Sequence, residues 1–267
     1  MTKKKKVKYS NTKIAIVFFV LLAVIIGISL LFKLVLIVRQ GQFDASKRFT
    51  LSVSNNKNLE VISLSPSTKS IVVFKLNKNI ALFKAAQFLE IPIDGRIIAN
   101  SLDLNQKISL LFLRAILNYK DMQTNLTIID LLKLLFFARS VPESDVNIKN
   151  IPQDLSGENI DKIVRRMISD EFIEKDNQTI QIINGTKVQG LGNRLARLVT
   201  NMGGDVIIVA TSNSPKNKSS ISYIDKKSYT IERLSKVLGM EAIKSAEFAI
   251  ADITIIIGED KANPSIF

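Results

Sequence analysis

The chain has 267 residues, of which 46% are hydrophobic, carries a net charge of +13, and contains no cysteine, histidine or tryptophan. This composition is apolar enough to bury a core, and it excludes disulfides, the usual cysteine and histidine zinc sites, and catalytic dyads built on either residue. Of the 37 basic side chains, eight lie in the first 39 residues, which contain no acid, so the remainder is only mildly basic. Because no dense basic stripe remains, we expect no nucleic-acid partner.

Residues 14–38 read IAIVFFVLLAVIIGISLLFKLVLIV and predict a single transmembrane helix. The stretch up to Phe32 carries no charge and rises through about 30 Å, the thickness of the hydrocarbon core. Six lysines in a basic tail, residues 1–13, precede it, and the positive-inside bias then predicts a cytoplasmic N-terminus and an extracytoplasmic remainder. A cleaved signal peptide and a buried soluble helix are the alternatives. We favour an uncleaved signal anchor, because no small-x-small cleavage site follows.

Residues 39–57 predict a short polar stalk that begins to order near Phe49, and residues 58–173 predict a central α/β domain. In the last part of this domain, Thr127 is placed to cap a helix with Asp130 in its first turn. The expected elements, in chain order, are a hairpin with strands at 59–64 and 70–76, a helix at 80–90, a strand at 96–99, helices at 106–118 and 127–139, and an amphipathic helix within 156–175, in which Asp161 and Arg165 are spaced to pair.

A polar linker, residues 174–179, leads into a predicted C-terminal domain, residues 180–260, and residues 261–267 form a tail. The expected order is β-α-β-β-α-β, with one apolar stripe on each helix and a glycine, Gly203 or Gly239, after each. Two such helices are predicted to cover one face of a four-stranded antiparallel sheet, a ferredoxin-like arrangement. The fold class of the whole chain is therefore α+β.

The turn before the first of these helices is rich in glycine, which raises the question of a phosphate site. A dinucleotide fingerprint needs a third glycine where this sequence has Leu195, although Gly190 and Gly192 supply the first two. No P-loop pattern follows either. We interpret the turn as structural, and Arg194 and Arg197 near the helix start as either a solvated basic face or an anion contact.

The same residues resemble a known family. IQIINGTKVQGLGNRLARLVTNMGGDVIIVATSN followed by ADITIIIGED is similar to the C-terminal domain of LytR-type envelope proteins. The matching positions are Asn184, Gly185, Thr186, Gly190, Leu191, Ala251, Asp252, Gly258 and Asp260. The resemblance implies an extracytoplasmic, membrane-tethered, non-catalytic domain. The candidate ligand or partner contacts are Asn184, Gly185, Thr186, Arg194 and Arg197.

The preceding segment resembles the catalytic domain of the LytR-CpsA-Psr phosphotransferases, which transfer glycopolymers from a polyprenyl pyrophosphate lipid to the wall. VISLSPSTKSIVVFKLNKN is similar to that family's first hairpin, and FLEIPIDGRIIANSLDL to its next helix and strand. The family's Pro-Arg-Asp is replaced here by Asn77, Lys78 and Asn79, which removes the arginine expected to grip pyrophosphate and the acid expected to hold a metal. The central domain therefore looks degenerate.

The sequence thus predicts a membrane-anchored extracytoplasmic envelope protein without catalytic, cofactor or metal residues, whose C-terminal domain binds a wall component or a partner protein. Two alternatives stay open. One is a structural spacer, and the other is a lipid-pyrophosphate phosphotransferase that would have to use Lys78, Asp94, Arg96 and Asp103. A deep apolar cavity rimmed by basic groups within residues 58–173 would favour lipid binding over a scaffold.

Overall fold

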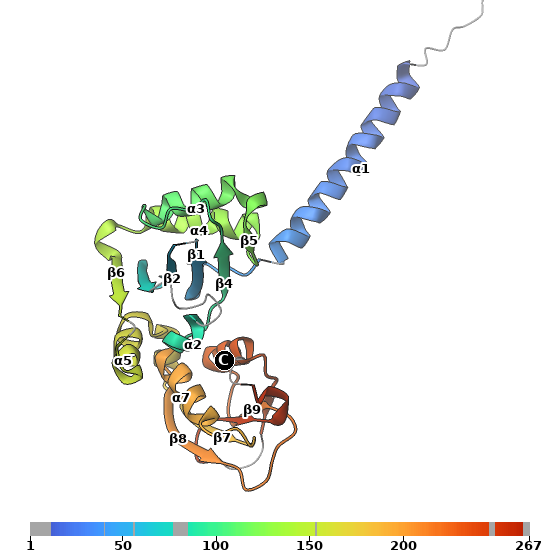
Figure 1. Ribbon diagram of the computed structural model, residues 1–267. Helices are drawn as coiled ribbons and strands as arrows, with labels where there is room; N and C mark the ends of the chain where they lie inside the picture. The colour runs from blue at the N-terminus through green and yellow to red at the C-terminus, as the bar shows by residue number, and fades with distance from the viewer. Residues whose placement is uncertain are drawn as a thin grey trace, which may run out of the picture. The chain divides into compact units, whose positions relative to one another are not determined.

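The computed structural model describes residues 12–39, 41–55, 57–76, 85–152, 154–245 and 249–263 (Figure 1). The chain divides into two compact units, residues 1–41 and 42–267. The triplet that replaces the Pro-Arg-Asp motif, residues 77–79, lies outside the described residues, as does the first half of the helix predicted at 80–90. The described part of that helix is α2 (Ala85–Leu89).

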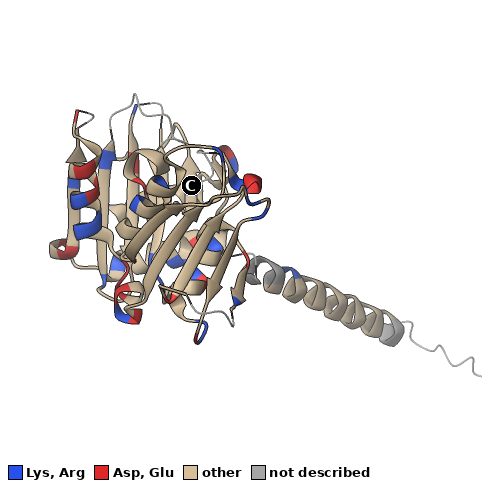
Figure 2. Ribbon diagram, turned by 90° about the horizontal axis from the view of Figure 1, so that it is seen from below, with Lys and Arg blue, Asp and Glu red and all other residues tan. Residues whose placement is uncertain are grey.

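The first unit is the helix α1 (Thr12–Arg39), as the apolar run predicts. Among the described residues, the stretch Ala15–Lys33 is the one long and apolar enough to cross a bilayer. Its ribbon carries no acidic residue and is tan along nearly all of its length (Figure 2). The helix therefore fits a membrane anchor.

The second unit begins with a six-stranded mixed sheet whose strand order is β5-β4-β1-β2-β3-β6. The predicted hairpin is confirmed, since the second and third strands pair antiparallel in full register. The strands are β1 (Phe49–Ser54), β2 (Leu59–Ser65), β3 (Ser70–Leu76), β4 (Gly95–Ile98), β5 (Gln123–Thr124) and β6 (Val146–Ile151).

Strand β1 lies within the segment predicted as a stalk, and all six of its residues are buried. It starts at Phe49, where ordering was expected, and runs between β2 and β4 near the middle of the sheet. Its apolar residues, Phe49, Leu51 and Val53, alternate with serine and threonine, so a six-residue strand with period two was hidden in a polar-looking stretch.

Helices cover both faces of this sheet, which explains why β2 is buried at every position. The first face packs on α3 (Ile108–Leu117) and α4 (Ile128–Ser140), and the second on α2 and α5 (Gly157–Ile168). The predicted cap of α4 is confirmed, because Thr127 and Asp130 form a reciprocal capping box.

The amphipathic helix predicted within 156–175 is instead two helices, α5 and α6 (Glu171–Asp176). The chain leaves the helical conformation at Ser169, and the Asp170 side chain accepts a hydrogen bond from the Phe172 amide, which caps α6. Asp161 pairs with Arg197 and not with the predicted partner Arg165. Arg197 lies on α7 (Leu191–Asn201), and its guanidinium donates two hydrogen bonds to the Asp161 carboxylate.

The second sheet has five strands in the order β10-β9-β11-β7-β8. The α+β class is confirmed, but the antiparallel ferredoxin-like pairing is wrong, since β7 pairs in parallel with both β8 and β11. Helix α7 crosses from β7 to β8 and thereby returns the chain in the same direction. The strands are β7 (Thr179–Asn184), β8 (Asp205–Thr211), β9 (Ser220–Tyr223), β10 (Ala242–Lys244) and β11 (Ile253–Ile257).

The two predicted helices of this part are α7 and α8 (Tyr229–Leu238), and their apolar stripes pack on the second sheet. Gly203 and Gly239 follow them with φ of 102° and 58°, the left-handed conformation expected after a helix end. The fifth strand, β10, was not predicted, because three residues are too few to show a period.

Candidate functional site

A cavity of about 570 Å³ lies against the first face of the first sheet. One wall is formed by apolar side chains of β3, including Ile71 and Val73. The opposite wall comes from the start of α3 and the end of α4, including Ile108 and Ala138. The other lining residues are Glu60, Lys75, Leu104, Asn105, Gln106, Lys107, Ser109, Arg139, Val141, Glu143, Val146 and Ile148.

Polar groups without partners lie in the lining of this cavity. Glu60 is 2% exposed, and its Oε2 has no hydrogen-bond partner, while its Oε1 lies 3.4 Å from Lys75 Nζ. Both polar atoms of the Gln106 side chain are also buried without a partner. Unpaired buried polar atoms cost free energy, so water or a ligand that hydrogen-bonds to these atoms would be stabilised in the cavity.

Burial raises the pKa of Glu60 above its ordinary value, and the nearby Lys75 ammonium opposes that rise. Desolvation therefore outweighs the ion pair at this carboxyl. Lys75 also donates to Asn105 Oδ1 at 3.2 Å, which holds its ammonium at the cavity.

Charged side chains of both signs line the cavity, with the basic ones in excess by one. Lys75, Lys107 and Arg139 line it, against the acids Glu60 and Glu143. Lys107 forms an exposed ion pair with Glu143, whereas Arg139 is exposed on the last turn of α4. Apolar walls with cations at the edge suit a molecule that has an apolar chain and an anionic head.

The Asn-Gly-Thr turn is held by its own hydrogen bonds. Asn184 Nδ2 donates to the Val188 carbonyl at 2.8 Å, and the Thr186 amide and hydroxyl both donate to Asn184 Oδ1. The Val188 amide in turn donates to Thr186 Oγ1. Asn184 and Thr186, two of the predicted ligand contacts, therefore stabilise the turn between β7 and α7 with their side chains.

Gly185 lies at the same turn, where no side chain fits. A Cβ there would lie 2.8 Å from the Ile257 carbonyl oxygen and 2.7 Å from Lys216 Cγ. Gly190, at the start of α7, has φ of 76°, which glycine adopts without strain. Close packing therefore requires glycine at position 185, and the backbone conformation favours glycine at position 190. Both causes are structural.

The two predicted arginines join α7 to the central part of the unit. Arg194 Nε donates to Glu90 Oε1 at 2.9 Å, and Arg197 binds Asp161 through Nε and Nη2 at 2.6 and 3.1 Å. Asn201 adds bonds to the Leu89 and Glu90 carbonyls. Both arginines therefore have acidic partners within the chain. Burial raises the pKa of Glu90, and the Arg194 guanidinium opposes that rise.

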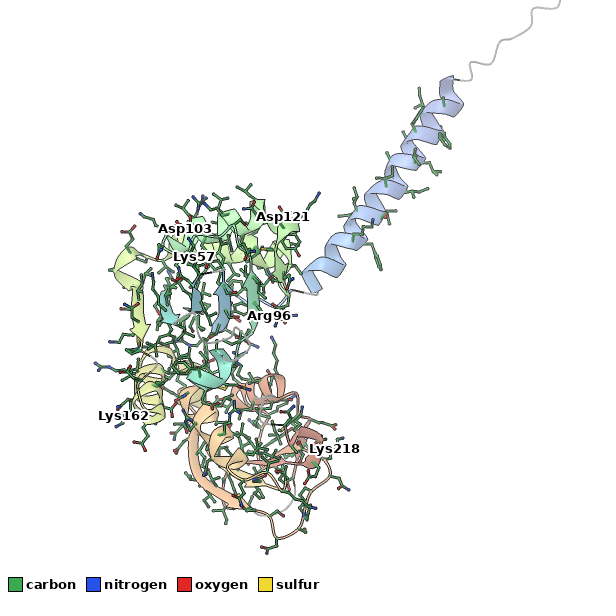
Figure 3. All side chains as sticks on the ribbon, in the orientation of Figure 1. Lys57, Arg96, Asp103, Asp121, Lys162 and Lys218 are labelled. Carbon is green, nitrogen blue, oxygen red and sulfur yellow. The ribbon has the colours of Figure 1, made fainter. Side chains whose placement is uncertain are left out.

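The residues that a phosphotransferase would need are not gathered in one place. Lys78 lies outside the described residues. Asp94 is held by Arg233 and by the Thr50 amide. Arg96 is exposed on β4, and Asp103 is exposed in the loop before α3 (Figure 3). Within the described ranges, no group of three or more acidic side chains is placed to hold a metal ion.

Residues 177–260 match the family described as LytR cell envelope-related transcriptional attenuator. This segment is a LytR C-terminal domain. The match associates the protein with the cell envelope, and α1 fits an anchor for such a protein. A search of the curated proteins finds no match.

Solved structures similar to this chain overlap less than half of it. The transcriptional regulator yvhJ from Bacillus subtilis is 14% identical with a TM-score of 0.36, over 44% of this chain and 94% of its own. Lin1025 from Listeria innocua is 10% identical with a TM-score of 0.33, over 46% and 97%. TagV from B. subtilis is 12% identical with a TM-score of 0.31, over 46% and 96%.

Several residues of the LytR C-terminal pattern form hydrogen bonds within this domain. Asp252 accepts from the Thr179 amide and hydroxyl, and these bonds lower the pKa of Asp252. Asp260 accepts from the Ser219 amide and hydroxyl at 2.8 and 2.7 Å. The acids near the end of the pattern therefore fasten β7 and β9 to the segment around β11.

Sequence reasoning missed the lining of the cavity. Its signals were Glu60, the one charged residue of strand β2, and an isolated arginine, Arg139, at the end of an apolar helix. Neither signal shows that β3, α3 and α4 leave a space between them, because that depends on how the helices pack.

Proposed function

We propose that the protein is a single-pass envelope protein whose bulk lies outside the cytoplasm and which works by binding and not by catalysis. Its central domain, residues 58–173 with β1 added, binds an amphiphilic anionic molecule in the cavity. Its LytR C-terminal domain contributes a second surface, for a wall component or a partner protein.

The cavity is the observation that carries this proposal. It combines apolar walls, unpaired polar atoms at Glu60 and Gln106, and a rim that includes Lys107 and Arg139. An isoprenoid or acyl chain would fill the apolar part, while a phosphate-bearing head would meet the cations. This is the feature expected of a lipid binder and not needed by a spacer.

Binding is tested with full-length protein in detergent and a fluorescent long-chain alkyl phosphate as the probe. Arg139→Glu is expected to weaken binding about thirtyfold, because a favourable charge contact of roughly 1 kcal/mol is replaced by a repulsive one of similar size, a difference of about 2 kcal/mol. Ala138→Phe, which fills the cavity, is expected to abolish binding. Lys162→Glu, on α5, is the matched control. Equal affinity in all variants would rule the cavity out.

The second surface is supported by the edge of the second sheet. Strand β8 is an outer strand, and its Ile207 and Val209 are 45% and 40% exposed. Purified full-length protein is expected to co-sediment with isolated wall material, and Ile207→Glu with Val209→Glu is expected to release it. Retention unchanged in this pair would exclude β8 as the contact.

Orientation has a direct test, since the chain has no native cysteine. A membrane-impermeant maleimide added to intact cells is expected to label Lys218→Cys in the C-terminal domain but not Lys5→Cys in the N-terminal tail. The reverse pattern would place the bulk of the protein in the cytoplasm.

The second candidate function is a phosphotransferase acting on a lipid-pyrophosphate-linked glycopolymer, and the same cavity favours it. Its test is turnover of a polyprenyl pyrophosphate substrate by the purified protein with Mg²⁺, which must fall in Arg96→Ala with Lys78→Ala. Binding without turnover supports the binding protein.

A further inference from the structure

The outer face of α3 and α4 carries several large apolar side chains that are exposed. Leu117 is 75% exposed and Phe136 is 65% exposed. Three further side chains extend this surface, Leu110, Ile128 and Leu132. On α3, positions 110, 114 and 117 follow helical spacing, as do 132, 136 and 139 on α4, so each helix presents one continuous outer stripe. We name this surface the α3–α4 face.

All the exposed charges within these two helices are positive. Arg114, Lys133 and Arg139 are exposed, whereas the acid in these helices, Asp130, is completely buried. Large apolar side chains flanked by lysine and arginine are typical of surfaces that rest on anionic lipid headgroups. Two exposed acids lie beside these helices: Asp44 is near Lys133, and Asp121 follows α3.

The buried Asp130 ties this face to the chain that follows α1. Its carboxylate accepts from the Gln42 and Phe43 amides at 3.1 and 3.0 Å while it caps α4 through Thr127. Phe43 is 3% exposed, and its ring packs against that of Phe137 on α4.

The chain that connects α1 to the residues held by Asp130 is short. Three residues lead from Arg39 to Gln42, which reach at most about 10 Å when fully extended. The first turn of α4, which holds Gln42 through Asp130, is therefore joined to the end of α1 by only a short stretch of chain.

We propose that the α3–α4 face lies on the membrane surface, with its apolar side chains at the boundary between headgroups and acyl chains and its cations against lipid phosphates. This inference rests on the proposed anchoring by α1, but adds a second contact that orients the second unit. Arg139 belongs to both the face and the cavity rim, so the cavity opens next to the lipid that would fill it.

The test uses full-length protein reconstituted into vesicles of phosphatidylcholine with and without phosphatidylglycerol. Single cysteines carrying an environment-sensitive NBD dye are placed by Leu117→Cys and Phe136→Cys on the face, and by Leu21→Cys in the anchor. Lys162→Cys and Lys218→Cys are the controls, because both positions lie away from α3 and α4 (Figure 3). Quenching by lipids with a nitroxide high on the acyl chain reports contact with the bilayer.

We expect the dye at positions 117 and 136 to be quenched several-fold more strongly than at 162 and 218, and more so with phosphatidylglycerol. Arg114→Glu with Lys133→Glu is expected to reduce that quenching without affecting position 21. Quenching at 21 with none above control at 117 and 136 overturns the proposal and leaves the anchor standing. A shifted emission at 117 and 136 without nitroxide quenching overturns it in favour of a protein contact. No quenching at 21 overturns both the anchor and this proposal.

Discussion

The ion pair between Arg233 and Asp94 makes a quantitative test of how the LytR C-terminal domain is held. Arg233 lies on α8, and Asp94 precedes β4 in the first sheet. Nη1 and Nη2 donate to the two carboxylate oxygens at 2.7 and 2.9 Å, and both side chains are 8% exposed. The perturbation is Arg233→Met, which keeps an unbranched side chain and removes the guanidinium with its charge.

The expected loss follows from these contacts. Two charge-assisted hydrogen bonds are worth about 1.5–3 kcal/mol each, and breaking a buried pair costs about 3–5 kcal/mol because one charge is left without its partner. Two terms offset part of this loss. Asp94 still accepts from the Thr50 amide, and the Arg233 Nε, which has no partner, is removed. We expect a net loss of about 2–4 kcal/mol in the free energy of unfolding.

The assay is urea unfolding of full-length protein in detergent, followed by far-ultraviolet circular dichroism and extrapolated linearly to water. The double variant Arg233→Met with Asp94→Asn is expected to recover at least about 2 kcal/mol relative to additive single losses, since no unpaired charge remains. Arg114→Met, at an exposed arginine, is the control and is expected to stay within about 0.5 kcal/mol of wild type. Additive single losses, or a loss below about 0.5 kcal/mol for Arg233→Met, would refute the reasoning.

Three further predictions concern stability. Burial raises the pKa of Glu60, so the folded protein disfavours the ionised carboxylate. The melting temperature of Glu60→Gln should therefore equal that of wild type below the ordinary pKa of 4.5. It should exceed that of wild type as the pH rises towards 8. Hydrogen bonds from Thr179 lower the pKa of Asp252, so Asp252→Asn should unfold at lower urea than wild type at pH 7, and the difference should vanish as the pH falls below 3.8. Gly185→Ala should cost about 1–3 kcal/mol in urea unfolding, because its Cβ meets the Ile257 carbonyl, whereas Gly27→Ala, with open space around it, should cost nothing in the second unit. A wild-type-like Gly185→Ala, or pH profiles parallel to wild type for the two acids, would contradict the contacts described.

The sequence by itself determined the features that depend on local pattern. The charge-free run up to Phe32 predicts α1 because a span needs only length and apolarity. The hairpin around Pro66, the cap at Thr127 and the glycine after α8 follow from turn and capping chemistry within a few residues. The Asn-Gly-Thr turn was recognisable as a family pattern for the same reason, since its hydrogen bonds close within five residues.

The tertiary structure decided what depends on distant residues. Strand β1 looked like stalk because its burial comes from neighbours on both sides, and the parallel pairing of β7 with β8 and β11 depends on where crossovers pack. Arg194 and Arg197 read as free cations in sequence, yet their partners lie 104 and 36 residues away. The cavity and the α3–α4 face are likewise properties of packing: whether an apolar side chain on α3 or α4 lies in the core, in a cavity or on the surface is set by the elements beside it, which no local pattern encodes.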